Sequence, residues 1–340
     1  MRIIALKIYR SLIAFSFRET PVNRFAWVIK ALITLAVFSW VFFRLIGEGV
    51  SLSSYKTLSE GYGLPGLILA LAGMPLNLAL ETMKWWFMIR KTGGSLGFKD
   101  AWKSVFAGLT TGIFTPNRIG EYAGRIAFLP PQLRIQGAVY LFVDRICQMV
   151  ITLWMGMLAM EYFWKYQRKV WLDSFTLDYT SWQMIRGALF AISVLLPFAI
   201  LLLPRIAKGS GNRQLRFAFF RKIATSLADL PSVVLFPVLF LGLLRYMVFS
   251  LQYVVLAYAF GFEGSGVLIF SMVWMIFLIK SVLPSITLTE LGIRESVALA
   301  IMGVFLVPAH IAFSATFILY VINIILPSVL GLYYVYRLKF

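Results

Sequence analysis

Long apolar runs alternate with short polar segments along most of the chain. A helix that crosses the hydrocarbon core of a bilayer needs about 20 predominantly apolar residues, and most of the runs reach or exceed that length. The two longest polar stretches, residues 161–182 and 204–230, are interpreted as loops. The pattern therefore predicts an all-α polytopic membrane protein. The apolar runs occupy residues 26–46, 64–83, 137–160, 184–203, 232–260, 266–283 and 310–336.

Composition supports the membrane interpretation. The chain is 60% hydrophobic and only 14% charged, whereas a soluble domain carries about 25% charged residues. The net charge of +18 would suggest nucleic acid in a soluble protein, but the Lys and Arg residues flank the apolar runs and fit anionic lipid headgroups. We therefore expect no nucleic-acid partner. With one Cys and one His, neither a metal site nor another cofactor is expected.

Charges in the short loops predict the orientation of the chain. Residues 84–103 and 204–222 are rich in Lys and Arg, which places them and both termini on the cytoplasmic side. Residues 1–25 combine apolar positions with scattered charges, which predicts a basic interfacial helix rather than a cleavable signal peptide. The remaining residues, 26–340, are expected to form a single transmembrane domain.

This orientation requires two regions of the domain to enter the membrane and turn back. Residues 101–129 would enter from the cytoplasm and break at Pro116, and residues 267–305 would enter from outside and break at Pro284. Hairpins that enter from opposite faces are typical of an inverted repeat. The expected fold has about seven spanning helices plus two re-entrant helical hairpins in an inverted-repeat arrangement. The two halves are residues 26–203 and 204–340.

Each hairpin carries a Glu and an Arg four residues apart, Glu121 with Arg125 and Glu290 with Arg294. This spacing puts both charges on one helix face, where they can pair. Ionisable residues within a membrane are costly and usually mark a substrate or ion pathway, and helix N-termini at the midplane would suit an anion. A purely structural alternative stays open, in which each pair only neutralises a broken helix.

Further charges fall inside the predicted spans. Asp144 and Arg145 are neighbours and point about 100° apart on a helix, so they are expected to serve different partners. Arg245 and Lys280 are the expected partners for Asp144. Lys84 lies near the end of a span and is interpreted as a side chain that reaches out to the headgroups.

Together these charges predict a phosphate-binding site, in which arginines hold the phosphate and carboxylates compete for the arginines. No catalytic residue is expected. The candidate substrate-binding residues are Arg118, Glu121, Arg125, Asp144, Arg145, Arg245, Lys280, Glu290, Arg294 and Glu295.

Three motifs resemble the lysylphosphatidylglycerol synthase transmembrane-region family, also called flippase-like. Its Thr-Pro-Gly-Arg-x-Gly-Glu motif is echoed by residues 115–121, an Asp-Arg pair by Asp144 and Arg145, and a late Pro-x-x-Gly-Gly-Leu-Gly-x-x-Glu motif by residues 284–295. The chain departs from the pattern at Asn117, which replaces a glycine, and at residues 287–290. The resemblance extends over nearly the whole sequence.

The resemblance implies movement of a phospholipid or polyprenyl-phosphate-linked lipid between leaflets of a bacterial cytoplasmic (inner) membrane. Well-known relatives also carry a soluble aminoacyl-transferase domain, and no hydrophilic segment here is long enough for one, so we expect a transporter rather than an enzyme. Anionic membrane lipids are the expected partners. Two alternatives stay open: a membrane-embedded headgroup or glycosyl transferase, and an assembly partner for a separately encoded transferase.

Overall fold

A computed structural model gives the fold of the chain. It describes residues 62–91, 93–113, 115, 118–175, 178–209, 218–283 and 287–336. The predicted interfacial helix 1–25 and the apolar run 26–46 lie outside these residues. Every regular element in the described ranges is a helix, as the apolar pattern predicts.

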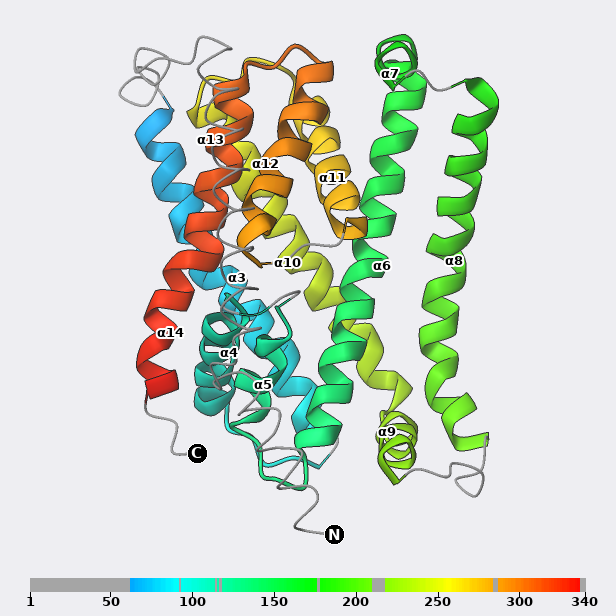
Figure 1. Cartoon of the computed structure of the whole chain (residues 1–340), viewed down its shortest axis with the longest axis vertical. Helices are drawn as coiled ribbons and strands as arrows, with labels where there is room; N and C mark the ends of the chain where they lie inside the picture. The colour runs from blue at the N-terminus through cyan, green and yellow to red at the C-terminus, as the bar shows by residue number, and fades with distance from the viewer. Residues whose placement is uncertain are drawn as a thin grey trace, which may run out of the picture.

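The helices form a bundle in which long and short elements lie side by side (Figure 1). The elements are α3 (Gly63–Lys91), α4 (Phe98–Ile113), α5 (Gly120–Ile126), α6 (Arg134–Tyr166), α7 (Arg168–Phe175), α8 (Tyr179–Gly209), α9 (Ala218–Ala228), α10 (Ser232–Ala259), α11 (Gly266–Val282), α12 (Thr287–Val304), α13 (Ala309–Tyr320), the π-helix η3 (Val321–Ile325) and α14 (Leu326–Tyr336).

Within the described ranges, five helical segments are long and apolar enough to cross a membrane. They coincide with five of the predicted runs. The run 266–283 forms α11, whose 17 residues rise only about 26 Å, less than a typical hydrocarbon core of about 30 Å. The five segments are Gly63–Lys91, Arg134–Tyr166, Tyr179–Ala199, Val233–Ala259 and Ala309–Tyr336.

The prediction of loops at residues 161–182 and 204–230 was largely wrong. Helix α6 continues to Tyr166 and is followed by α7, while the second stretch holds the end of α8 and the whole of α9. Residues 161–175 contain neither Gly nor Pro, so nothing in the backbone opposes a helix there. Trp171 anchors α7, because its buried ring stacks on Phe163 with 4.7 Å between centroids.

Helix α8 begins with a side-chain cap. One carboxylate oxygen of Asp178 accepts hydrogen bonds from the backbone N–H groups of Thr180 and Ser181, at 3.2 and 3.3 Å. The hydroxyl and backbone N–H of Ser181 lower the pKa of this carboxyl, since both favour its charged form. Asp178 thus satisfies N–H groups that a helix start leaves without an intrahelical partner.

Two helical hairpins occupy opposite halves of the bundle (Figure 1). Helices α4 and α5 lie in the lower half of the view, and α11 and α12 lie in the upper half, while α6 runs the full height beside them. Helix α12 contacts α4, so the hairpins meet near mid-height. The helices end and restart on either side of the predicted breaks at Pro116 and Pro284, as expected.

The apolar core is divided in the same way. One buried cluster includes Met272 and Ile276 of α11, and the other includes Val105 and Leu109 of α4. Each hairpin is therefore packed into its own part of the core, and the polar groups described next lie beside the first hairpin.

Glycines bring the two helices of the first hairpin into close contact. A Cβ atom on Gly120 would lie 2.2 Å from the backbone oxygen of Thr111, and one on Gly124 would lie 2.3 Å from the Thr111 hydroxyl oxygen. That hydroxyl donates a hydrogen bond of 2.7 Å to the backbone oxygen of Gly120. Small residues four apart allow such close approach between helices in membranes. The hairpin can therefore hold α5 firmly against α4.

Candidate functional site

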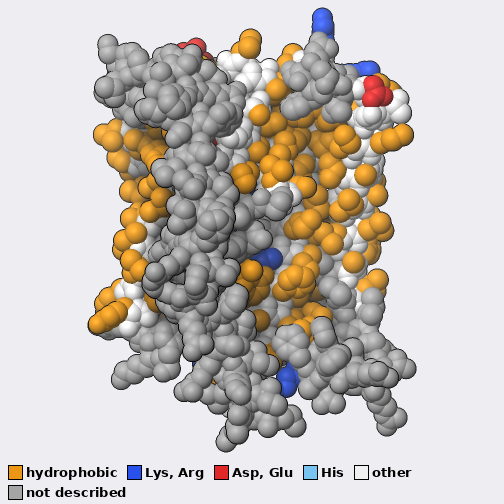
Figure 2. Space-filling model, in the orientation of Figure 1, with side chains coloured by type: hydrophobic (Ala, Val, Ile, Leu, Met, Phe, Trp, Pro, Cys, Tyr) orange, Lys and Arg blue, Asp and Glu red, His pale blue; other side chains and the backbone are white. Residues whose placement is uncertain are grey.

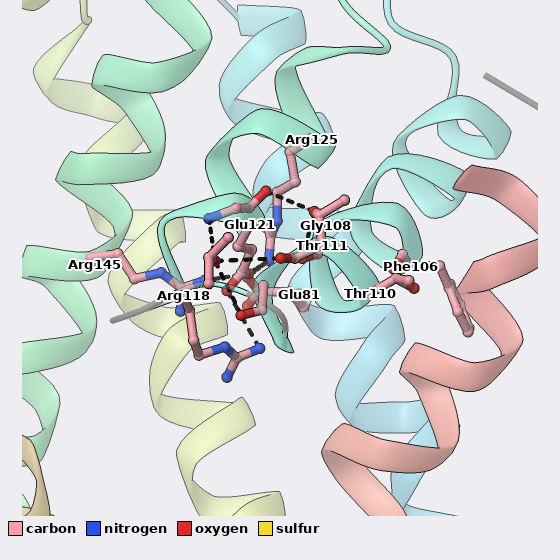
Figure 3. Close-up of polar contacts among 12 residues, drawn as sticks. Glu81, Phe106, Gly108, Thr110, Thr111, Arg118, Glu121, Arg125 and Arg145 are labelled. Carbon is pink, nitrogen blue, oxygen red and sulfur yellow. Dashed lines mark hydrogen bonds and ion pairs between the residues drawn. The ribbon is translucent and has the colours of Figure 1, made fainter. Parts of the chain in front are cut away.

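A cluster of buried and half-buried charges lies where α3, α5, α6 and α10 converge (Figure 3). Ion pairs of 4 Å or less connect its members through Glu81 and Glu121. Helix α5 reaches this position because the glycine contacts press it onto α4. We call this set the charge cluster; its members are Glu81, Lys84, Arg118, Glu121, Arg125, Asp144, Arg145 and Arg245.

Arg125 forms the centre of the cluster. Its Nη2 lies 2.5 Å from Glu121 Oε1 and 2.5 Å from Glu81 Oε1, and the whole side chain is buried. The pairing of Glu121 with Arg125 that their spacing predicts is confirmed. Arg125 is therefore enclosed between two carboxylates.

Lys84 is also enclosed, and its predicted position at the headgroups was wrong. Its Nζ lies 3.0 Å from Glu81 and 2.7 Å from Asp144, and its side chain is buried. Two carboxylates offset the cost of burying the ammonium group, so it has no need to reach water.

The expected partners of Asp144, Arg245 or Lys280, were also wrong, because Asp144 pairs with Lys84. The expectation that Asp144 and Arg145 serve different partners is confirmed. Arg145 donates from Nη2 to Glu121 and, at 3.3 Å, from Nη1 to Gln148.

Three arginines are less enclosed, and we call them the rim arginines: Arg118, Arg145 and Arg245. Their side chains are 24%, 32% and 14% exposed. Arg118 and Arg145 both approach Glu121, the first at 3.4 Å, while Nε of Arg245 lies 3.3 Å from Glu81. They come from the turn before α5, from α6 and from α10, so three separate elements present guanidinium groups around the same two carboxylates. Figure 3 shows Arg118 and Arg145 beside these carboxylates.

Backbone geometry at the hairpin tip positions the first rim arginine. Arg118 has a positive φ of 56°, a conformation uncommon for residues other than glycine. The next element, α5, has only seven residues, shorter than the expected return through residues 119–129. Its first backbone N–H, on Gly120, donates to the Thr115 hydroxyl at 2.7 Å. The site therefore depends on side-chain charges rather than on this helix end.

The second hairpin carries the other candidate residues. Arg294 and Glu295 of α12 are buried, and the Arg294 guanidinium lies 4.9 Å from the centroid of the Tyr320 ring. Lys280 is half-buried on α11, and the side chain of Glu290 lies outside what the structure describes. The charge cluster itself is built from α3, α5, α6, α10 and the turn before α5.

Two members of the charge cluster, Glu81 and Lys84, were not among the residues predicted to bind substrate. Glu81 has the larger number of partners. It contacts Lys84, Arg125 and Arg245. A usable signal was present, because Glu81 falls inside the apolar run 64–83 and a carboxylate there needs a partner. In the part of the chain that the structure describes, no group of three or more His, Cys, Asp or Glu side chains is arranged to hold a metal ion.

The fold and the buried charges define a multi-pass helical membrane protein with a polar centre. The chain matches the family described as Lysylphosphatidylglycerol synthase TM region over residues 27–331, and it belongs to that family. The resemblance inferred from the three motifs is thus confirmed. No curated protein matches the chain at a significant level. Membership of this family associates the chain with membrane lipids.

Proposed function

We propose that the protein moves a lipid with an anionic phosphate headgroup between the leaflets of the membrane, by way of the charge cluster. The observation that carries this proposal is the partial exposure of three rim arginines around carboxylates that are themselves buried. Charges used only to stabilise a fold need no exposure. A site that binds and releases an anion needs cations that the anion can reach.

The proposal places the two hairpins as re-entrant elements that enter the membrane from opposite faces. Two features support this placement: α11 is shorter than a span, and the hairpins lie in opposite halves of the bundle with α12 touching α4 (Figure 1). Irregular backbone at such depth needs a protein or water-filled environment. The second hairpin, with Lys280, Glu290, Arg294 and Glu295, then supplies the counterpart site for the other leaflet. The proposed location is the cytoplasmic (inner) membrane of a bacterium, with both termini on the cytoplasmic side.

The surroundings of Arg145 favour a lipid over a soluble anion. Phe142 and Met149 share its helix face, three residues before and four after it, and are 57% and 43% exposed. Figure 2 shows hydrophobic side chains over much of the described part of one face of the molecule, with a Lys or Arg side chain visible at mid-height. Acyl chains could therefore stay against apolar surface while the headgroup contacts the arginine.

Competition for the arginines provides a route for release. Glu121 forms ion pairs with Arg118, Arg125 and Arg145. A bound phosphate replaces Glu121 as the partner of Arg118 and Arg145, while Arg125 stays paired with Glu81. Because the carboxylates remain close by, they can take the arginines back when the headgroup leaves.

The test is translocation of labelled anionic lipid in liposomes reconstituted with the protein. One charge-assisted hydrogen bond contributes about 1.5–3 kcal/mol, so Arg118→Gln with Arg145→Gln is expected to slow translocation at least about tenfold. The matched control is Lys103→Gln on α4, an exposed cation paired with Asp100 at 2.8 Å. Translocation by the double variant at the rate of the unsubstituted protein would contradict the proposal.

A further inference from the structure

The balance of charges in the cluster specifies the headgroup further. We infer that the charge cluster selects a lipid phosphomonoester, whose headgroup carries two negative charges, over a phosphodiester lipid, which carries one. This inference rests on the proposed function and names its substrate class. It is carried by the cluster's charge balance and by the number and placement of the rim arginines.

Five cations meet three carboxylates in the cluster. The cations are Lys84, Arg125 and the rim arginines, and the carboxylates are Glu81, Glu121 and Asp144. Arginine stays protonated in proteins, so among the described residues the cluster has an excess of two positive charges. Uncompensated charge away from water is costly. A dianion neutralises the excess, whereas a monoanion leaves one charge and a zwitterion leaves both.

The excess is located on the rim arginines. Lys84 and Arg125 are buried, and each already contacts two carboxylates. Nε of Arg118, of Arg125 and of Arg245 is buried and donates no hydrogen bond, but only the rim arginines among these cations have partly exposed side chains. The guanidinium groups that a ligand can reach therefore belong to the rim arginines.

The number of rim arginines also matches the chemistry of a phosphomonoester. Its terminal phosphate has three unesterified oxygens, and the phosphate of a diester has two. The rim arginines come from three elements and form ion pairs with Glu121 and Glu81. Guanidinium groups are planar forks suited to phosphate oxygens. Each terminal oxygen can thus face its own guanidinium group.

Binding of phosphatidic acid and phosphatidylglycerol to the purified full-length protein in neutral detergent tests the inference. At about pH 7.5 the monoester is mostly dianionic, since its second pKa lies near 6, and we expect it to bind about tenfold more tightly. At about pH 5 it is mostly monoanionic and the preference should largely disappear. Comparing both lipids at each pH removes any effect of pH on the protein that acts on the two lipids alike.

A charge-removing variant provides the second arm. Arg245→Gln lowers the excess from two to one, so the preference for phosphatidic acid should fall while phosphatidylglycerol still binds; Arg118→Gln makes the same change if Arg245→Gln does not fold. Lys103→Gln should keep the full preference. Equal affinities at about pH 7.5, or a preference unchanged by pH or by both rim substitutions, would overturn the inference.

Two further measurements distinguish a lipid from free phosphate as the ligand, and the dianion inference from the transport proposal. Inorganic phosphate should displace bound phosphatidic acid poorly, and equally effective displacement would assign the site to free phosphate and overturn selection of a lipid. Equal binding and equal translocation of both lipids would overturn the dianion inference and leave lipid transport standing. A retained binding preference without translocation would support selection of the dianion and contradict transport.

Discussion

Replacement of Glu121 by glutamine is expected to lower the free energy of unfolding by about 3–5 kcal/mol. Glutamine keeps the shape of the side chain but removes the charge that faces Arg118, Arg125 and Arg145. Arg125 is buried, so it cannot turn to water for compensation. Arg125 keeps Glu81 at 2.5 Å, but the cluster then holds one more uncompensated positive charge away from water, which is strongly destabilising.

Thermal unfolding in a mild detergent measures the effect, and a drop of more than about 6 °C is expected. Glu161→Gln is the matched control, because it breaks an ion pair with Arg186 that lies at the exposed end of α6. Exposed pairs contribute about 0–1 kcal/mol. Equal shifts for the two variants would show that burial of the cluster adds nothing to the Glu121 interactions.

Replacement of Lys84 by methionine is expected to destabilise the protein to a similar extent, because it leaves a buried negative charge without its cation. Methionine fills most of the space of the lysine stem, but Asp144 then lies buried without the ammonium group at 2.7 Å. We expect a loss of about 3–5 kcal/mol, as for other broken buried pairs. Thermal unfolding of the Lys84→Met variant in a mild detergent measures this loss.

The double variant Lys84→Met with Asp144→Val decides whether the two residues act as a pair. Removing both charges of a buried pair is often close to neutral, so the double variant should be more stable than Lys84→Met alone. Residues in one ion-pair network deviate from additivity by about 0.5–3 kcal/mol. Additive losses in the double variant would mean that Lys84 is buried for a reason other than Asp144.

Local features of the sequence predicted the local features of the structure. Glu121 and Arg125 pair because four residues on a helix bring two side chains together whatever the rest of the fold does. The helix breaks near Pro116 and Pro284 follow from a residue that lacks a backbone N–H. Apolar runs of about 20 residues likewise predicted an all-helical fold, because the length of a run is also a local feature of the sequence.

Contacts between distant segments were outside the reach of such patterns. Lys84 and Asp144 are 60 residues apart, so the alternative that a lysine near a span end reaches the headgroups looked equally consistent with the sequence. The role of Glu81 depends on α5, α10 and α3 converging, which periodicity does not reveal. The amphipathic helices α7 and α9 were interpreted as loops because their polar composition outweighed their helical spacing.

The proposed function requires that Arg118, at the tip of the first hairpin, can be reached from water within the membrane. Its most direct test is the reactivity of Arg118→Cys with a membrane-impermeant thiol reagent in intact vesicles, in a Cys147→Ser background, since Cys147 is the chain's only cysteine. The reference is Leu195→Cys, at an exposed apolar position midway along α8. We predict that Arg118→Cys reacts readily and Leu195→Cys does not; an Arg118→Cys variant as inert as Leu195→Cys would contradict the account.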